Sequence, residues 1–321
     1  MKIVIPGGSG QIGTLLARAF QGDGHEVVVL SRAPVPAPWR VVAWDAETLN
    51  NWACELDGAD AVINLAGRSV DCRYTRSNRR ALVESRVNST RVVGAAIAKS
   101  ARPPRVWLQA STATIYAHRF DAPNDEVTGV VGGAELNVPD TWRFSIQVAK
   151  AWEQATNEAC VPHTRKVLLR SAMTMSPDRG GVFDVLLGLV RRGLGGTNGT
   201  GSQYVSWIHD CDFIRAIYWL IENDLEGAVN LSSPFPIPNV EFMRTLREAW
   251  GKSFGLPSTR WMLEIGAFFL RTETELILKS RRVVPARLLD AGFPFEFATW
   301  KIAAKDLCER WRAARHITIP S

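Results

Sequence analysis

The chain has 321 residues, of which 46% are hydrophobic and 22% charged, and its formal net charge is +6. This length allows a buried core without disulfides or metal ions, and the five widely spaced cysteines form no C-x-x-C pair, so we predict no metal site and a reducing, cytoplasmic location. The positive charge suits an anionic small molecule. We predict no nucleic-acid or membrane partner, because the basic residues form no stripe with aromatics and no apolar run nears roughly 18 residues.

Strands alternate with helices through the first half of the chain. Six short apolar runs predict strands at 2–6, 25–32, 40–45, 60–67, 105–112 and 165–172. Helical spacing predicts the intervening helices at 14–23, 78–101 and 142–160. Strands that are apolar on both faces and separated by helices indicate an α/β fold with a doubly wound parallel sheet.

The pattern changes after about residue 174. We predict a helix at 182–192, a glycine-rich loop, short strands at 204–209 and 228–233 around a helix at 211–222, and a mostly helical tail broken by prolines. These elements predict a sheet domain, made of residues 1–173 and about 203–232, and a smaller domain. The smaller domain comprises about 174–202 and 233–321, and we expect a ligand in a cleft between the two.

The stretch "IPGGSGQIG" at 5–13 lies between the first strand and the first helix. It contains G-x-G-x-x-G, from Gly8, and G-x-x-G-x-x-G, from Gly7; both spacings share Gly10 and Gly13. Glycines at a strand–helix turn allow close backbone approach to a pyrophosphate, which the N–H groups of the helix then bind. The alternative is an ordinary glycine-rich turn.

The end of the second strand bears on the choice of cofactor. Sites that prefer NAD usually carry Asp or Glu there, bonded to the ribose 2′-hydroxyl. This chain has Ser31 and Arg32 instead. A serine and an arginine suit a 2′-phosphate, so we predict NADP(H) rather than NAD(H), with a solvated Arg32 as the alternative.

Several longer stretches carry a family resemblance. "NLAG" at 64–67 and "QASTATIYA" at 109–117 resemble the extended short-chain dehydrogenases/reductases. "SRVNSTRVV" at 85–93, "AWEQAT" at 151–156, the run at 179–209 that ends "GLGGTNGTGSQYVSWIH", and "RRVVPARLLDAGFPFEF" at 281–297 resemble its atypical "epimerase family protein" branch. The resemblance implies a Rossmann domain that binds NADP(H), a smaller substrate-binding domain, and the wider glycine spacing, which leaves Gly8 as spare turn flexibility.

The resemblance also implies a set of cofactor residues. These are Gly7, Gly10, Gln11, Ile12 and Gly13 around the pyrophosphate, Ser31 and Arg32 at the 2′-phosphate, Leu65, Ala66 and Gly67 along the cofactor, Arg86 on the following helix, and Met173 near the nicotinamide. Asp45 ends the third strand, where it either faces the adenine or caps a helix.

The catalytic pair of the superfamily is missing. That pair is Tyr-x-x-x-Lys on a helix, in which the tyrosine transfers a proton and the lysine lowers its pKa and holds the ribose. Alignment on the Trp-Glu dipeptide at 152–153 places Ser145 at the tyrosine position and Ala149 at the lysine position. Lys150 is one residue off, and alignment on it places Ile146 at the tyrosine position.

Three other residues are candidates for the chemistry. Thr112 aligns with the usual serine or threonine, although a strand-end threonine is the alternative. Tyr116, four residues later, is a candidate proton donor or a packed aromatic. His209 ends the "WIH" strand and is a candidate substrate contact or a structural histidine.

The sequence therefore predicts an NADP(H)-dependent oxidoreductase or epimerase-like enzyme that acts on a small, possibly anionic substrate. The alternative is a non-catalytic NADP(H)-binding sensor or partner-binding module, which the missing pair favours.

Overall fold

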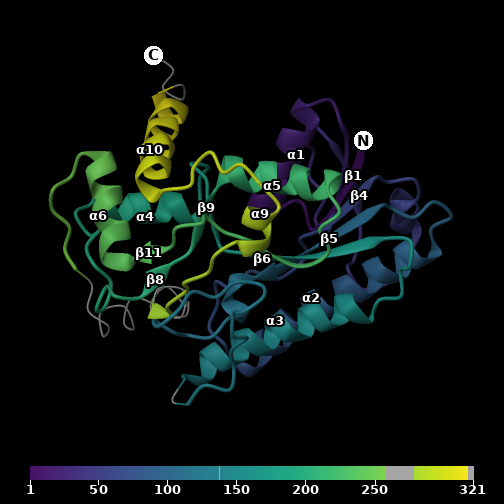
Figure 1. Ribbon diagram of the computed structural model, residues 1–321. Helices are drawn as coiled ribbons and strands as arrows, with labels where there is room; N and C mark the ends of the chain where they lie inside the picture. Colours follow the sequence, from purple (N-terminus) through teal and green to yellow (C-terminus); the bar gives the residue numbers. More distant parts are fainter. Residues whose placement is uncertain (137, 258–277, 317–321) are drawn as a thin grey trace. The chain divides into compact units, whose positions relative to one another are not determined.

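The computed structural model describes residues 1–136, 138–257 and 278–316 and divides into two compact units (Figure 1). The first unit comprises Met1–Ile115, Arg143–Ser171 and Ile214–Val229, and the second comprises Tyr116–Trp142, Ala172–Phe213 and Asn230–Ser321.

Two segments that we predicted within the sheet domain, 116–142 and 203–213, fall in the second unit instead. Hydrogen bonds explain the first difference: the Asn124 N–H donates to the Arg282 carbonyl at 2.6 Å, and the Val284 N–H donates to the Asn124 carbonyl at 2.9 Å. The second difference arises because Trp207 lies in the core of the second unit.

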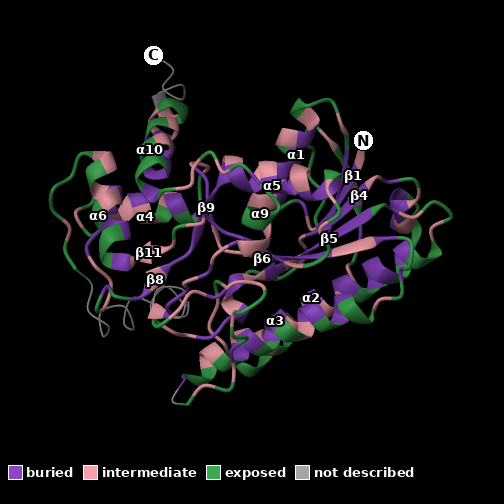
Figure 2. Ribbon diagram, viewed as in Figure 1, coloured by how far each residue is buried: buried purple, intermediate pink, exposed green. Residues whose placement is uncertain are grey.

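The first unit contains a seven-stranded sheet in the order β10-β6-β5-β4-β1-β2-β3, which confirms the predicted Rossmann-type fold. Every neighbouring pair from β6 to β3 is parallel. The strands are β1 Lys2–Pro6, β2 Glu26–Ser31, β3 Arg40–Ala43, β4 Ala61–Asn64, β5 Val106–Thr112, β6 Arg165–Ser171 and β10 Gly227–Leu231. The central strands are buried on both faces, as their apolar sequences predict (Figure 2).

Strand β4 ends earlier than predicted. The apolar run continues to Gly67, but the strand stops at Asn64, whose side chain donates to Gln109 at 2.9 Å. The Asn64 side-chain oxygen then accepts the Ala66 N–H at 3.1 Å. This side-chain bond replaces a strand-to-strand bond of the backbone at Ala66.

Helices cover both faces of this sheet (Figure 1). The helices α2 Arg76–Lys99 and α3 Asp140–Glu158 run side by side on one face. On the other face, α1 Gln11–Gly22 contacts α5 Asp210–Glu222, since the rings of Phe20 and Tyr218 lie 4.5 Å apart. Helix α2 starts two residues earlier than predicted, because the Thr75 side chain accepts the Asn78 N–H at 3.3 Å and caps it.

The second unit has its own core, built around Trp300. Its ring stacks on Phe242 at 4.1 Å, and its indole N–H donates to the Phe242 carbonyl at 2.9 Å. The elements are β7 Met173–Met175, α4 Val182–Arg191, β8 Tyr204–Val205, β9 Trp207–His209, β11 Ile237–Pro238, α6 Asn239–Trp250, α9 Ala286–Asp290 and α10 Trp300–His316, with η1 Asn51–Leu56 and η2 Ala113–Ile115 as short turns of the first unit.

The predicted helical tail is observed in α6, α9 and α10, whereas residues 258–277 lie outside the described residues. The sequence did not predict strand β7, which pairs in parallel with β9. Within the described ranges, no helix is both long and apolar enough to cross a bilayer.

Candidate functional site

The glycine loop joins β1 to α1, and close packing within the protein accounts for most of its glycines. Gly7 has φ of 73°, and a Cβ there would lie 2.6 Å from the Cα of Ala66. A Cβ on Gly13 would overlap the backbone of Gly8, and one on Gly8 would lie 2.9 Å from the Ile5 carbonyl. Gly8 is therefore required by packing and is not the spare residue that we predicted.

Gly10 differs from its neighbours. Among the described residues, the nearest atom to a Cβ there would be the Gly7 carbonyl oxygen at 4.0 Å, and the Gly10 φ of −78° suits any residue. The protein itself therefore does not require a glycine at this position. A cofactor approaching the backbone would require one, which fits the predicted pyrophosphate site.

The start of α1 also fits an anionic group. Its N-cap is Gly10, no side chain caps it, and its first turn holds no acidic residue. The N–H groups of the first turn and the positive end of the helix dipole remain for a ligand. Gln11, in that turn, has a buried side-chain nitrogen without a hydrogen-bond partner among the described residues, and Ile12 beside it is half-buried.

The predicted 2′-phosphate residues lie at the end of β2. Ser31 is buried, donates to the Ser9 hydroxyl at 3.2 Å and accepts the Ala33 N–H at 3.3 Å, so it connects the strand end to the glycine loop. Arg32 is exposed and makes no hydrogen bond or ion pair within the described part of the chain. Its guanidinium is thus available to an anion.

Asp45 caps a turn. Its carboxylate accepts the N–H groups of Glu47 and Thr48 at 2.9 Å each and is also bonded to the Thr48 hydroxyl. Those bonds, the Thr48 hydroxyl foremost, lower the pKa of Asp45 to about 2. Of the two predicted roles, the geometry matches the cap.

The loop after β4 brings Gly67 beside Arg86. The Leu65 N–H donates to the Pro6 carbonyl at 2.8 Å, which places Leu65 and Ala66 next to the glycine loop. A Cβ on Gly67 would lie 3.2 Å from the Arg86 guanidinium carbon. Arg86 is buried and donates to the Leu82 carbonyl at 3.1 Å.

Glu153 fixes the position of α3 against the sheet. Its carboxylate accepts hydrogen bonds from the Ser111 hydroxyl at 2.6 Å and from two nitrogens of Arg170 at 2.8 Å each. Thr112 follows Ser111 at the end of β5, where its partly exposed hydroxyl accepts the Thr114 N–H at 3.2 Å. Its catalytic role stays a prediction.

A phenol that the sequence analysis missed contacts the residue at the position of the missing tyrosine. The Tyr74 hydroxyl is 3.2 Å from the Ser145 hydroxyl, and Ser145 is the residue that the alignment placed at the tyrosine position. The two residues are 71 apart in the chain, so no local pattern could reveal the contact.

Two other predicted residues belong to the second unit. Tyr116 is buried, and its hydroxyl donates to the Asn230 side chain at 3.0 Å, which suits a packed aromatic better than an exposed proton donor. Met173 is half-buried in β7, where its N–H donates to the Ser206 carbonyl at 3.4 Å. Their predicted roles stay predictions.

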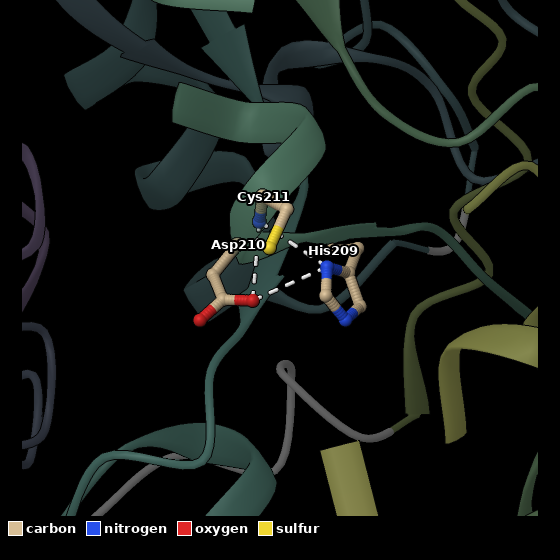
Figure 3. A group of neighbouring side chains, drawn as sticks. All are labelled: His209, Asp210 and Cys211. Atoms are coloured by element: carbon tan, nitrogen blue, oxygen red, sulfur yellow. Dashed lines mark hydrogen bonds and ion pairs between the residues drawn. The ribbon is translucent and has the colours of Figure 1, made fainter. Parts of the chain in front are cut away.

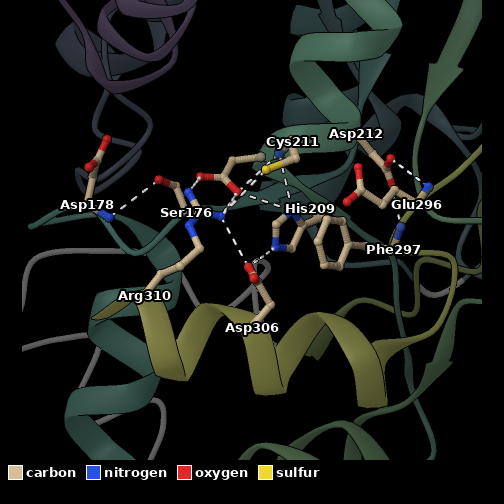
Figure 4. A network of polar contacts seen from close by, with 10 residues as sticks. Ser176, Asp178, His209, Cys211, Asp212, Glu296, Phe297, Asp306 and Arg310 are labelled. Carbon is tan, nitrogen blue, oxygen red and sulfur yellow. Dashed lines mark hydrogen bonds and ion pairs between the residues drawn. The ribbon is translucent and has the colours of Figure 1, made fainter. Parts of the chain in front are cut away.

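His209 is enclosed in a polar network (Figures 3 and 4). Its Nε2 lies 2.9 Å from the Asp306 carboxylate, its Nδ1 accepts the Cys211 N–H at 3.2 Å, and its ring stacks on Phe297 at 3.7 Å. Burial lowers the pKa of His209, and Asp210 and Asp306 oppose the decrease. The imidazole is fully buried, so a substrate contact would require this network to open.

The potential metal ligands in this network are already engaged. Atoms of His209, Asp210 and Cys211 lie within 4.8 Å of one another, but Asp210 binds Arg310 through bonds of 2.7 and 2.8 Å. Burial raises the pKa of the Cys211 thiol to about 11. The guanidinium therefore occupies the place of a cation (Figure 4).

Comparison with known proteins gives two family matches. Residues 3–232 match the NAD dependent epimerase/dehydratase family, and residues 259–307 match a domain of unknown function, DUF1731. The chain is 31% identical over 313 residues to human epimerase family protein SDR39U1, covering 96% of this chain and 99% of the relative. It is also 31% identical over 301 residues to an epimerase family protein of Mycobacterium tuberculosis, covering 92% and 94%.

Solved structures agree with these matches. The crystal structure of the human protein with NADPH superposes with a TM-score of 0.84 at 29% identity, covering 96% of this chain and 99% of that one. A nucleoside-diphosphate sugar epimerase from Corynebacterium glutamicum gives a TM-score of 0.73 at 26% identity, covering 100% of this chain and 62% of that one. The chain therefore belongs to the NAD dependent epimerase/dehydratase family, within the atypical extended short-chain dehydrogenases/reductases known as epimerase family proteins.

Proposed function

We propose that the chain is an NADP(H)-dependent oxidoreductase or epimerase-like enzyme that acts on a small-molecule substrate. The observation that carries the cofactor choice is the end of β2, where an exposed Arg32, which has no partner among the described residues, stands in place of a carboxylate. The human relative whose structure contains NADPH supports the same choice.

The residues of the first unit fit such a cofactor. Gly10 offers an open backbone beside the uncapped start of α1, and Gln11 has a buried amide nitrogen for which the described part of the chain supplies no acceptor. In this proposal the α1 N–H groups bind the pyrophosphate and Arg32 binds the 2′-phosphate.

A bound NADP(H) would supply or accept a hydride. Thr112 is partly exposed at the end of β5, and its hydroxyl would then orient the oxygen of the substrate. Orientation and proximity contribute much of the rate in such reactions, so a missing Tyr-x-x-x-Lys pair does not by itself argue against turnover.

The test is stereospecific hydride transfer from NADPH labelled with deuterium on one face of the nicotinamide. The purified protein is incubated with a panel of carbonyl compounds, and transfer of the label from one face only supports the proposal. Thr112→Val is expected to slow the transfer and Thr112→Ser to retain most of it. Tight NADPH binding without transfer to any compound would favour a non-catalytic sensor.

A further inference from the structure

One face of α3 lacks the two side chains on which the chemistry of the superfamily depends. Ser145 and Ala149 stand at the tyrosine and lysine positions, and Trp152 follows one turn later. With 3.6 residues per turn, these three positions lie on one face of the helix. Two side chains from outside α3 approach that same face.

Tyr74 brings a phenol to Ser145. Their hydroxyl oxygens are 3.2 Å apart, and the Tyr74 ring packs edge-on against Phe144, with centroids 5.1 Å apart. The tyrosine backbone is held as well, because Arg79 Nε donates to the Tyr74 carbonyl at 3.0 Å and the adjacent Thr75 caps α2. The phenol is therefore positioned by neighbours in the same unit, and its side chain is partly exposed.

Arg86 brings a cation to Trp152. Its guanidinium lies over the indole, 4.9 Å from the ring centroid, and the residue is only 9% exposed. Burial lowers the pKa of Arg86 to about 10, so it remains charged at neutral pH.

The partners of this cation are few. Within the described ranges Arg86 forms no ion pair, and its guanidinium donates one hydrogen bond, to the Leu82 carbonyl. A guanidinium has five N–H donors, so the others can bind the oxygens of a ligand that reaches this largely buried cation. Gly67 lies against it, where any larger residue would crowd the guanidinium.

We propose that Tyr74 and Arg86 replace the missing Tyr-x-x-x-Lys pair, with Arg86 binding the ribose hydroxyls in the nicotinamide half of the cofactor and Tyr74 acting as the proton donor. The inference rests on the proposed function. In reduction of a carbonyl, NADPH supplies the hydride to carbon, and Tyr74 gives its hydroxyl proton to the oxygen, so that the product is an alcohol. The phenolate then regains a proton from water.

The first test separates the two halves of the cofactor. Adenosine 2′,5′-bisphosphate carries the 2′-phosphate but lacks the second ribose and the nicotinamide. Arg86→Gln is expected to weaken NADPH at least about tenfold, as loss of a charge-assisted hydrogen bond does, and to leave binding of the bisphosphate unchanged. Arg86→Lys should retain part of the affinity.

The control is Arg91→Gln, an exposed arginine on the same helix, which should change neither ligand. Calorimetric titration gives the affinities, and a thermal melt checks that each variant is folded. If Arg86→Gln, folded, weakens both ligands equally or neither, Arg86 does not hold the nicotinamide half.

The second test asks whether Tyr74 lies beside the nicotinamide half of the cofactor, and it requires no substrate. Tetranitromethane nitrates accessible tyrosines, and peptide mass spectrometry quantifies each site. NADP⁺ is expected to protect Tyr74 at least fivefold and the bisphosphate not to protect it, whereas Tyr204, half-buried in the second unit, serves as the reference. Equal protection by both ligands, or by neither, would overturn the assignment.

Hydride transfer then tests the proton donor. Tyr74→Phe is expected to reduce the single-turnover rate at least tenfold with unchanged NADPH affinity, while Tyr204→Phe retains the rate. A Tyr74→Phe variant as fast as the wild type would refute the donor role. Failure of the wild type to transfer hydride refutes the proposed function and the donor step, but the fragment comparison still decides the Arg86 site. Arg32→Ala tests the NADP(H) site itself, because it should weaken both ligands.

Discussion

Gly10→Ala separates the two reasons for which a glycine can occur in the loop, namely packing within the protein and approach of a ligand. At Gly10 the nearest protein atom to an added Cβ is 4.0 Å away, and φ of −78° and ψ of 175° are open to alanine. At Gly13 the added Cβ would overlap the Gly8 backbone. The two variants should therefore behave differently.

For Gly10→Ala two small terms oppose each other in the protein without cofactor. Alanine reduces the entropy of the unfolded chain, which stabilises by ~0.4–1 kcal/mol, but it is a poorer N-cap than glycine by a similar amount. The free energy of unfolding should thus change by less than about 1 kcal/mol. Gly13→Ala forces backbone atoms apart and should destabilise by ~1–3 kcal/mol or more.

The affinity for NADPH should change in Gly10→Ala even though the stability of this variant changes little. If the pyrophosphate rests on the Gly10 backbone, the new methyl group should weaken NADPH at least about tenfold, or ~1.4 kcal/mol. Urea denaturation gives the stability, and calorimetric titration gives the affinity. Wild-type affinity in Gly10→Ala would show that no ligand approaches this backbone, and destabilisation as large as in Gly13→Ala would refute the packing argument.

Three further predictions concern other residues. Arg32→Ala should weaken NADPH by ~1–3 kcal/mol and NADH hardly at all in calorimetric titration, and an equal loss for both cofactors would show that Arg32 does not bind the 2′-phosphate. Glu153→Gln removes the carboxylate from an ion pair with Arg170 whose two side chains are 10% and 11% exposed, and it should lower the free energy of unfolding by ~3–5 kcal/mol in urea, whereas a loss below about 1 kcal/mol would contradict this argument. Burial lowers the pKa of His209 below its usual 6.5, so the unfolded chain binds more protons between the two pKa values. Stability should consequently rise with pH up to about 6.5 and be lost as pH falls through that window; His209→Gln should flatten this part of the curve, and an unchanged slope would rule out the assignment.

Local sequence determined the sheet and the place of the glycine loop between β1 and α1 well. Strands such as 2–6 and 105–112 are apolar on both faces. A parallel sheet covered by helices removes both of these faces from water. The glycine spacing and the pair at the end of β2 are each short local patterns. Each could therefore be interpreted from the sequence without knowledge of long-range contacts. Boundaries were less accurate, because caps such as Thr75 and turns such as that at Asn64 depend on individual hydrogen bonds.

Only the tertiary structure showed which side chains from other elements contact α3. The sequence showed that its phenol and lysine are missing, but not that the hydroxyl of Tyr74, 71 residues before Ser145, contacts the Ser145 hydroxyl. It also placed Arg86 on the next helix without showing that the guanidinium is buried against Trp152 and bonded to the Leu82 carbonyl. Such contacts join residues that no local periodicity relates, because they arise where α2 packs on α3. The sequence thus determined which groups the chain contains, and the packing of the helices decided which of those groups meet.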